Sequence, residues 1–323
     1  MTERIRVLIT GATGFAGKHL VRALEEEGPS TFEIFGTTYS NTPLPSGNGF
    51  FFLDMRSGRD VARLVSEVRP DWIFHLAAVS SVRSSWHMRT ETMETNVLGT
   101  HNLLEGVRLG APGARILFVS SADVYGNSGS RGKALKEDAP FEIRSPYAYS
   151  KAAGEMLCGY YEKIEKIDIV IARPFPHTGP GQTEDFVCSD WARQIARIEK
   201  GDIAPVLNVG NLELHRDFSD VRDVVRAYMH LLRKGRRGGV YNVCSGRIIP
   251  LREILNFLVN EAFKDAPVSI EVDVVKLRKI DVPCQLGSHK KIAEETGWLP
   301  GIPIDQTLRD LLGYWRNKVR NGS

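Results

Sequence analysis

Two side chains suited to proton transfer lie four positions apart. Tyr147 and Lys151 belong to the segment Ser145-Pro-Tyr-Ala-Tyr-Ser-Lys151, in which a serine N-cap followed by proline predicts a helix start. Residues four apart share one helical face, and a nearby ammonium lowers the pKa of a tyrosine from about 10. Such a tyrosine can exchange a proton with a sugar or alcohol oxygen near neutral pH. Taken alone, the pair is more often an exposed helix face.

A hydroxyl group is expected close to this tyrosine. The segment Ser120-Ser-Ala-Asp-Val-Tyr-Gly126 follows an apolar strand pattern, and ligands of open parallel sheets bind beyond the carboxyl ends of the strands. We therefore expect Ser121 to orient the same reacting oxygen.

Three glycines form a turn near the N-terminus. Gly11, Gly14 and Gly17 separate a short apolar strand pattern from a helical pattern. The first glycine permits a tight turn, the second lets the backbone approach a pyrophosphate, and the third lets helix and strand pack closely. The helix N-terminus then offers N–H groups to phosphates. The spacing departs by one residue from the usual GxGxxG, but the strand-turn-helix context predicts a dinucleotide site. A glycine-rich turn without a ligand is the alternative.

The end of the second predicted strand bears on the choice of dinucleotide. NAD sites usually carry an acidic residue there, on the ribose 2′-hydroxyl, whereas residues 36–41 read Gly-Thr-Thr-Tyr-Ser-Asn. The missing carboxylate permits a 2′-phosphate, although no arginine is present either. The sequence favours NADP(H) and also permits NAD(H). Besides its effect on Tyr147, we expect Lys151 to hydrogen-bond the nicotinamide ribose.

Apolar runs alternate with amphipathic helical patterns through the first half of the chain. Predicted strands cover 6–10, 32–38, 49–53, 72–76, 115–120 and 167–172, and predicted helices cover 18–27, 58–68, 91–109 and 146–166. This alternation predicts an α/β fold, a Rossmann-like doubly wound parallel sheet.

The pattern changes after Arg173, where a cluster of proline and glycine predicts a loop. Helices near 190–199 and 221–234, a strand at 240–244 and a strand near 269–275 follow. We expect residues 1–173 plus about 217–243 to form the dinucleotide-binding domain. Residues 174–216 plus 244–323 would form a smaller mixed α/β substrate domain.

Composition excludes several classes of protein. The 323 residues carry 42 Lys+Arg against 39 Asp+Glu, a balance too even to favour nucleic acid as a partner. No run reaches the roughly 20 apolar residues of a membrane span, and no signal-peptide pattern is seen. The four cysteines are far apart and form no CxxC pair, which argues against a zinc cluster or a disulfide framework. We expect a cytoplasmic enzyme without a metal.

Together these motifs resemble the extended short-chain dehydrogenase/reductases over essentially the whole chain. The resemblance rests on the glycine turn, Asp54, Leu76-Ala-Ala78, Asn96, Ser121 and Tyr147-xxx-Lys151. It implies nicotinamide chemistry on nucleotide sugars, with Asp54 at the adenine and Ala77 and Ala78 lining the cofactor pocket. The implied cofactor contacts are Gly11, Thr13, Gly14, Phe15, Gly17, Thr38, Asp54, Met55, Leu76, Ala77, Ala78, Asn96, Tyr147, Lys151 and Pro174.

The second half is similar to the GDP-4-keto-6-deoxy-mannose reductases. The similarity covers residues 173–182, 216–223, 281–283, 296–303 and 307–316. It implies NAD(P)H-dependent reduction of GDP-4-keto-6-deoxy-D-mannose to GDP-D-rhamnose by a homodimer. The implied substrate contacts are Ser80, Ser121, Tyr147, His177, Arg216, Arg222 and Arg278.

Three positions depart from that pattern. Pro176 stands where the family has an asparagine that faces the substrate, and because proline has no donor, that contact is lost or moved to His177. Lys279 replaces a common proline, and Ser288 replaces a favoured aspartate. Pro176 bears on fine substrate specificity.

Two other functions remain open. A GDP-mannose 4,6-dehydratase needs a carboxylate base, and Asp123 occupies the position of the dehydratase glutamate. Ser121 in place of threonine, the short chain and the missing arginine pair argue against this reaction, and the lack of cysteine at 123 argues against epimerisation. A non-catalytic dinucleotide-sensing regulator typically loses the tyrosine or the lysine, and both are present.

Several charged and polar residues have a second, purely structural interpretation. Arg216 and Arg222 suit a diphosphate because guanidinium binds phosphate in a bidentate manner, but Arg222 could equally form an ion pair with a neighbouring aspartate. His75 lies in an apolar strand pattern and fits a core histidine. His177 fits either sugar binding or a role within its loop.

Overall fold

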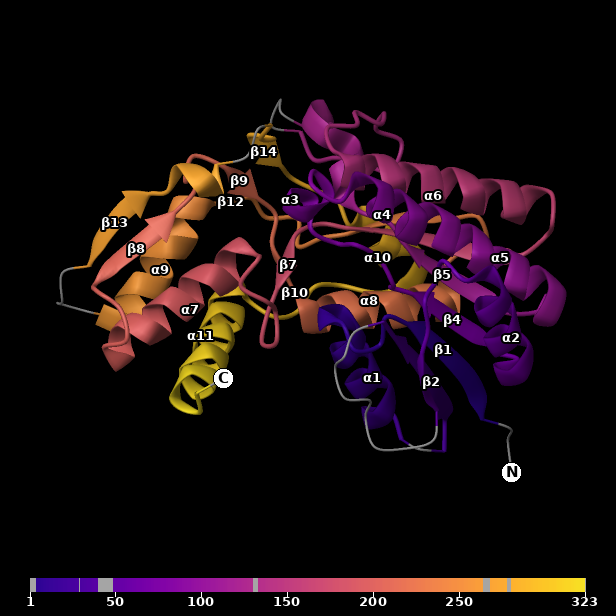
Figure 1. Ribbon diagram of the computed structural model, residues 1–323. Coiled ribbons are helices and arrows are strands. Elements are labelled where there is room, and N and C mark those ends of the chain that lie inside the picture. Colours follow the sequence, from indigo (N-terminus) through magenta and orange to yellow (C-terminus); the bar gives the residue numbers. More distant parts are fainter. Residues whose placement is uncertain are drawn as a thin grey trace.

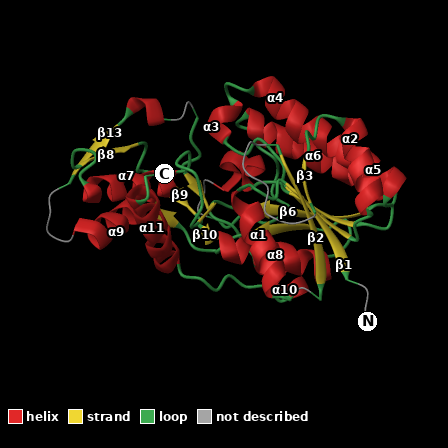
Figure 2. Ribbon diagram, turned by 60° about the horizontal axis from the view of Figure 1, so that its bottom comes forward, coloured by secondary structure: helices red, strands yellow, loops and turns green. Residues whose placement is uncertain are grey.

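A computed structural model describes residues 4–28, 30–39, 49–129, 133–263, 268–277 and 280–322. Its centre is a sheet of seven strands, all parallel, in the order β11-β6-β5-β4-β1-β2-β3 (Figures 1 and 2). The strands are β1 (Ile5–Thr10), β2 (Phe32–Thr38), β3 (Phe50–Phe52), β4 (Trp72–His75), β5 (Arg115–Val119), β6 (Asp168–Pro174) and β11 (Val240–Val243). The predicted Rossmann-like doubly wound sheet is confirmed.

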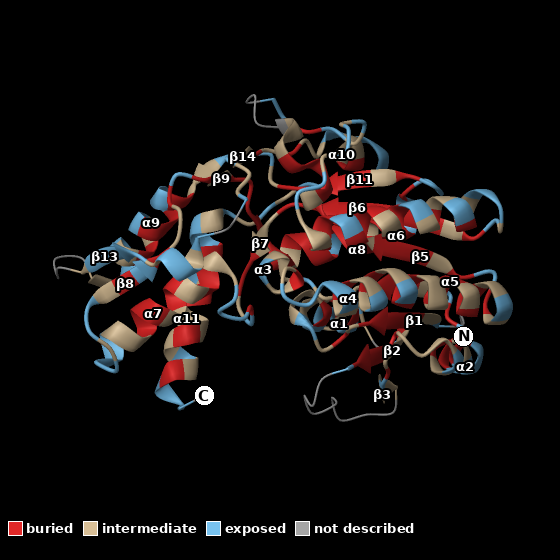
Figure 3. Ribbon diagram, turned by 45° about the horizontal axis from the view of Figure 1, so that its top comes forward, coloured by how far each residue is buried: buried red, intermediate tan, exposed pale blue. Residues whose placement is uncertain are grey.

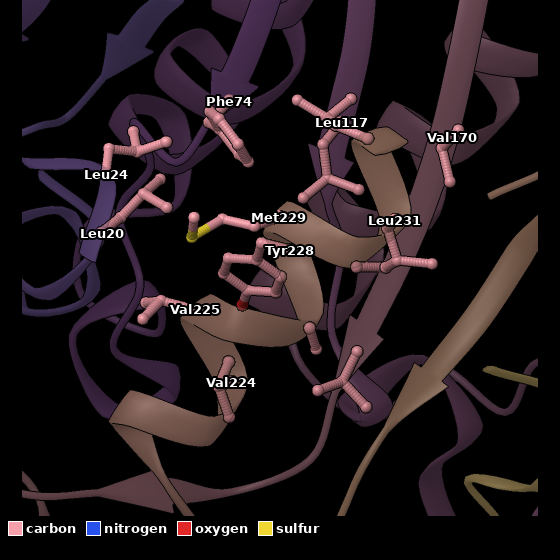
Figure 4. Packing of buried hydrophobic residues seen from close by; sticks show 14 of the residues in the cluster. Leu20, Leu24, Phe74, Leu117, Val170, Val224, Val225, Tyr228, Met229 and Leu231 are labelled. Atoms are coloured by element: carbon pink, nitrogen blue, oxygen red, sulfur yellow. The ribbon is translucent and has the colours of Figure 1, made fainter. Parts of the chain in front are cut away.

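Helices cover both faces of this sheet, as its two apolar faces require. On one face, α1 (Phe15–Glu26) and α8 (Val221–Lys234) bury Leu20, Leu24 and Tyr228 against Phe74 and Leu117 of the strands (Figure 4). On the other face lie α2 (Gly58–Val68), α5 (Gly99–Gly110) and α6 (Pro146–Lys163). The buried central strands and these two helix layers form the core of the larger part of the molecule (Figure 3).

The helix predicted over 91–109 is interrupted. The structure has the short helices α3 (Val82–Ser85) and α4 (Arg89–Met93), then a π-helical turn at Glu94–Leu98, then α5. A π turn inserts one extra residue into the helical ladder. Here it contains the buried side chain of Asn96.

A second core lies in the smaller part of the chain. It is built by α7 (Val187–Lys200), α9 (Leu251–Phe263) and α11 (Ile304–Arg320) with the strand β8 (Val206–Val209). The exposed strand β13 (Ser269–Val272) pairs with β8 in parallel. The predicted strand near 269–275 therefore ends at 272, and a 3-10 turn at Val274–Lys276 follows.

Short strands and one helix connect the two parts. These elements are β7 (His177–Thr178), β9 (His215–Arg216), β10 (Ser219–Asp220), β12 (Ile249–Pro250), β14 (Cys284–Gln285) and α10 (Lys290–Thr296). Ile292 of α10 and the following Trp298 pack in the core of the larger part, a point on which the structure differs from the predicted domain division. No helix in the described ranges is long and apolar enough to cross a bilayer.

Candidate active site

A cleft of about 1410 Å³ lies at the carboxyl ends of β1, β4, β5 and β6. Residues of the smaller part, among them Trp191 and Leu214, form its other wall. The predicted site residues that line it are Gly11, Thr13, Gly14, Phe15, Gly17, Thr38, Asp54, Met55, Leu76, Ala77, Ala78, Ser80, Ser121, Asp123, Tyr147, Lys151, Pro174, His177 and Arg216. Adjacent parallel strands thus bring together residues far apart in sequence.

The glycine turn has the geometry of a phosphate cradle. Gly11 has φ +74°, and a Cβ atom on it would lie 2.9 Å from the backbone nitrogen of Ala77. A Cβ on Gly17 would lie 2.4 Å from the carbonyl oxygen of Gly11. Helix α1 begins after Gly14 with no side-chain cap and no acidic residue in its first turn. Its N–H groups and positive dipole end therefore suit a pyrophosphate.

Hydroxyl groups, not a carboxylate, occupy the end of β2. The Thr13 hydroxyl donates to the Thr38 hydroxyl at 2.6 Å, and Gly11 N–H donates to Thr37 Oγ1 at 3.2 Å. Among the described residues at the end of β2, none is acidic and would repel a ribose 2′-phosphate.

A guanidinium that the sequence argument missed reaches the same region. Arg56 follows β3, donates to both carboxylate oxygens of Asp54, and donates to the Tyr39 hydroxyl at 2.7 Å. The adjacent Arg56 lowers the pKa of the Asp54 carboxyl. Arg56 was overlooked because it stands eighteen positions beyond Thr38, a separation that the pairing of β2 with β3 closes.

Helix α6 carries the proton-transfer pair as predicted. The Ser145 hydroxyl accepts from the backbone N–H of Ala148 at 3.0 Å, and Pro146 is the first helical residue. Tyr147 and Lys151 follow on the buried side. Ser121 comes from the end of β5 on the adjoining part of the cleft wall. The structure thus places all three side chains along one cleft.

The pKa of Tyr147 differs from the expectation. Burial and the charge of Asp123 raise it well above its ordinary value, while a hydrogen bond with Ser121 lowers it in part. The Lys151 Nζ donates to the carbonyl oxygen of Val119 at 2.8 Å and lies over the Tyr147 ring, 5.9 Å from its centroid. Burial lowers the pKa of Lys151 to about 8. In this state Tyr147 is a neutral phenol.

A buried ion pair lies behind the cleft. Arg173 donates through Nε and a terminal nitrogen to Glu155 at 2.9 and 2.7 Å, and both side chains are about 5% exposed. The Ser120 hydroxyl donates to the same carboxylate, and Arg173 also donates to the Tyr125 hydroxyl at 2.8 Å. Because Ser120 and Arg173 immediately precede Ser121 and Pro174, this network fixes two strand ends of the cleft.

Two predicted site residues lie elsewhere. Asn96 does not line the cleft. Its Oδ1 accepts from Val79 N–H, and its Nδ2 donates to the carbonyl oxygen of Val79 and to the Ser150 hydroxyl, the latter at 2.9 Å. It thereby fastens the segment after β4 to α6. Arg222 does not line the cleft either. It forms ion pairs with Asp220 and Asp310, both at 2.7 Å, so the ion-pair alternative for this residue is the one that the structure shows. Arg278 and Lys279 lie outside the described residues.

The sugar side of the cleft holds His177 and Arg216. The His177 ring stacks on Phe15 with centroids 6.0 Å apart, and its Nδ1 lies 3.0 Å from the carbonyl oxygen of Phe175. Burial lowers the pKa of His177. Arg216 is largely buried and donates to the carbonyl oxygen of His215 at 2.9 Å. Pro176 lines the cleft too, and its carbonyl accepts from Ser219 N–H.

His75 is a core residue, as its apolar strand pattern indicates. Its ring nitrogens contact the hydroxyls of Thr10 and Thr100 at 2.7 and 2.9 Å. Burial lowers its pKa to about 3, so the imidazole is neutral and serves to join β1, β4 and α5.

Comparison with known proteins identifies the family of the chain. The model of the family described as GDP-mannose 4,6 dehydratase matches residues 8–311. A GDP-6-deoxy-D-mannose reductase of Pseudomonas aeruginosa is 36% identical, with 99% of each chain covered. A GDP-mannose 4,6-dehydratase of Yersinia enterocolitica is 26% identical, covering 95% of this chain and 92% of that one.

A solved structure extends the similarity to three dimensions. The Pseudomonas aeruginosa protein named RMD, complexed with NADPH, aligns with a TM-score of 0.85 and 36% identity, covering 97% of this chain and 99% of that one. The glycine turn, the seven parallel strands and the Tyr147–Lys151 helix are the features that the extended short-chain dehydrogenase/reductases share. The chain therefore belongs to the GDP-mannose 4,6 dehydratase family of extended short-chain dehydrogenase/reductases.

Proposed function

We propose that the protein reduces the 4-keto group of GDP-4-keto-6-deoxy-D-mannose to give GDP-D-rhamnose, with NADPH as the favoured and NADH as the second cofactor. The observation that carries this proposal is the placing of Ser121, Tyr147 and Lys151 along one cleft with an uncapped glycine turn. The 36% identity to a named reductase over nearly the whole chain supports it.

The glycine turn, Asp54 and the segment Leu76–Ala78 would hold the cofactor, which supplies the hydride that reduces C4. As the C4–H bond forms, negative charge develops on O4. Tyr147 gives its phenolic proton to O4, so that the phenol O–H bond breaks and an alcohol O–H bond forms. Ser121 orients O4 by a hydrogen bond. Tyr147 is then reprotonated from solvent.

The raised pKa of Tyr147 suits this direction of reaction. A proton donor must hold its proton until the acceptor becomes basic, and a neutral phenol does so at every physiological pH. The sequence argument has the same proton transfer, with Tyr147 protonating the developing alkoxide, but it expects Lys151 to lower the pKa of Tyr147.

Lys151 predicts the pH dependence of the reduction. With its pKa lowered to about 8, the ammonium form predominates below that pH and is lost above it. If the ammonium is required, kcat/KM for NADPH falls about tenfold per pH unit above pH 8. Steady-state rates measured across this pH range show the fall in kcat/KM. Arginine cannot lose its charge, so Lys151→Arg is expected to abolish this fall, although its kcat/KM at lower pH should be below that of the wild type. A wild-type profile that stays flat to pH 10 contradicts this role.

On the substrate side, Arg216 would bind the diphosphate and Ser80 and His177 the sugar. Arg216 lies in β9, on the wall of the cleft contributed by the smaller part. Pro176 supplies no side-chain donor, so we assign the contact that an asparagine would make to His177.

Product analysis tests the reductase proposal against the dehydratase. The protein is mixed with GDP-4-keto-6-deoxy-D-mannose and NADPH, and separately with GDP-mannose alone. We expect oxidation of NADPH and one GDP-6-deoxyhexose in the first mixture, and no change in the second. A keto product from GDP-mannose would instead favour the dehydratase, with Asp123 as its base. The configuration at C4 of the product distinguishes rhamnose from 6-deoxy-talose.

We also propose a homodimer through α5 and α6. Met156 and Tyr160 of α6 and its C-cap residue Ile164 are 74%, 52% and 62% accessible and follow one another at four-residue spacing, and Leu109 of α5 is 68% accessible. Met156→Glu is expected to convert a dimer to monomer in light scattering, because it places a charge in an apolar interface. Leu299→Glu, at a residue before α11 that is 62% exposed, is the control and should leave the mass unchanged. A wild-type monomer would refute the proposal.

A further inference from the structure

The residues assigned to the cofactor, the sugar and the diphosphate leave the guanine base of the proposed substrate without a partner. The smaller part of the molecule contributes two charged residues to the cleft wall, Asp190 of α7 and Lys276 at the end of the 3-10 turn after β13. Gly210 joins this wall to the strand of Arg216, because a Cβ atom on Gly210 would lie only 3.2 Å from the Lys276 carbonyl oxygen. The wall that carries the proposed diphosphate ligand therefore continues to this charged pair.

Asp190 and Lys276 form an ion pair that further hydrogen bonds hold in place. Lys276 Nζ donates to Asp190 Oδ2 and, at 2.8 Å, to the carbonyl oxygen of Asn208. Gln194 Nε2 donates to the same two acceptors, both at 3.0 Å. The side chains of Asp190 and Lys276 are still 19% and 25% accessible. The pair is thus fixed between α7 and β8 and remains open to a ligand in the cleft.

This ion pair keeps unused hydrogen-bonding capacity. An ammonium has three N–H donors, and Lys276 uses two of them within the protein. A carboxylate offers about four lone-pair sites on its two oxygens, and Asp190 receives two hydrogen bonds, both on Oδ2. No residue in the described part of the chain donates to Asp190 Oδ1. One donor and a carboxylate edge are therefore left side by side.

Apolar side chains flank the pair on the same wall. Val275 and Leu277, the sequence neighbours of Lys276, are exposed and line the cleft, and so does the exposed Ile280. Exposed apolar residues that gather in a cleft around a few polar groups are typical of a ligand surface. This surface suits the face of a flat ring, and the ion pair suits its polar edge.

We propose that Asp190 and Lys276 select the guanine base of the substrate. One edge of guanine carries the acceptor O6 beside two donors, N1–H and the 2-amine. The remaining N–H of Lys276 donates to O6, and the Asp190 carboxylate accepts from N1–H and the amine. Adenine has a donor in place of O6, and uracil has an acceptor in place of the amine, so both fit this pair less well. The assignment rests on the proposed GDP-sugar substrate and names the residues that choose its base.

Calorimetric binding of nucleoside diphosphates to the full chain tests this assignment. Inosine diphosphate is GDP without the 2-amine, and we expect the wild type to bind GDP roughly 10–100-fold more tightly, the range for a hydrogen bond to a charged group. Asp190→Asn should lose this preference and gain affinity for xanthosine diphosphate, whose 2-oxo group accepts from the new amide. Lys276→Met should weaken GDP and inosine diphosphate alike, because both carry O6.

Asp202→Asn is the matched control, since Asp202 follows α7 and pairs with Lys200 outside the cleft lining. Its affinities should equal those of the wild type. Asp190→Ser is a second neutral variant should the asparagine fold poorly, with circular dichroism as the check. Equal binding of GDP and inosine diphosphate by the wild type, or an unchanged preference in the folded Asp190 variants, overturns the assignment.

Parallel assays of the reduction of GDP-4-keto-6-deoxy-D-mannose separate this assignment from the proposed function. A wild type that reduces the sugar but binds GDP and inosine diphosphate equally keeps its function and loses the base assignment. A wild type that shows the expected base preferences but does not reduce the sugar keeps the assignment and loses the function. Tighter binding of uridine diphosphate than of GDP would refute both.

Discussion

Replacing Tyr147 with phenylalanine lowers kcat for the reduction by about 10²–10⁴-fold, the usual contribution of a positioned proton donor. The loss corresponds to about 2.7–5.5 kcal/mol of barrier. The ring fills the same buried space, so the fold and the affinity for NADPH should persist. Stopped-flow oxidation of NADPH measures the chemical step, and fluorescence of bound NADPH measures the affinity.

Tyr149→Phe is the matched control for this variant. Tyr149 lies two residues later on the same helix, is 55% exposed, and does not line the cleft. It loses the same hydroxyl group without losing a donor from the site, so its kcat should equal that of the wild type. If Tyr147→Phe also stays within threefold of the wild type, the proton comes from another group and the mechanism above is wrong.

The sheet and most of the cleft could be predicted because they depend on local patterns. Alternating strands and helices with a glycine turn specify a doubly wound sheet, and in such a sheet the ends of adjacent strands meet at one edge. That rule alone places Gly11, Leu76, Ser121 and Pro174 together, and the structure confirms that all four line one cleft.

The errors concern properties that only tertiary packing determines. Spacing put Tyr147 and Lys151 on one helix face, but burial and a strand carbonyl decided where the ammonium points. Asn96 was assigned to the cofactor, yet a π turn directs its amide to the backbone beside α6. Arg222 could bind phosphate or aspartate, and Asp310, eighty-eight positions away, settles its partner.

The Glu155–Arg173 pair is the feature that the sequence argument overlooked altogether. A glutamate within a helix and an arginine near the end of a strand are usually exposed, and these two stand eighteen positions apart. Only the packing of α6 against the sheet buries both side chains. Because this ion pair lies directly behind Ser121 and Pro174, the same contacts contribute to the stability of the fold and to the geometry of the cleft.

Replacing Glu155 with glutamine is expected to lower the free energy of unfolding by about 3–5 kcal/mol, because it leaves the Arg173 guanidinium buried without an opposite charge. The Ser120 hydroxyl and Arg173 both lose their anionic acceptor. Urea denaturation followed by circular dichroism measures the change, and reductase activity should fall with it because the strand ends at Ser121 and Pro174 shift.

Glu162→Gln is the control. Glu162 lies on the same helix and pairs with Arg237 in a partly exposed bridge, in which the side chains are 21% and 40% accessible. Such surface pairs contribute at most about 1 kcal/mol, so the two identical substitutions separate burial from charge. A double variant, Glu155→Leu with Arg173→Met, removes both charges and should regain much of the stability lost by Glu155→Gln. Equal destabilisation by Glu155→Gln and Glu162→Gln would show that the buried pair does not hold the cleft in place.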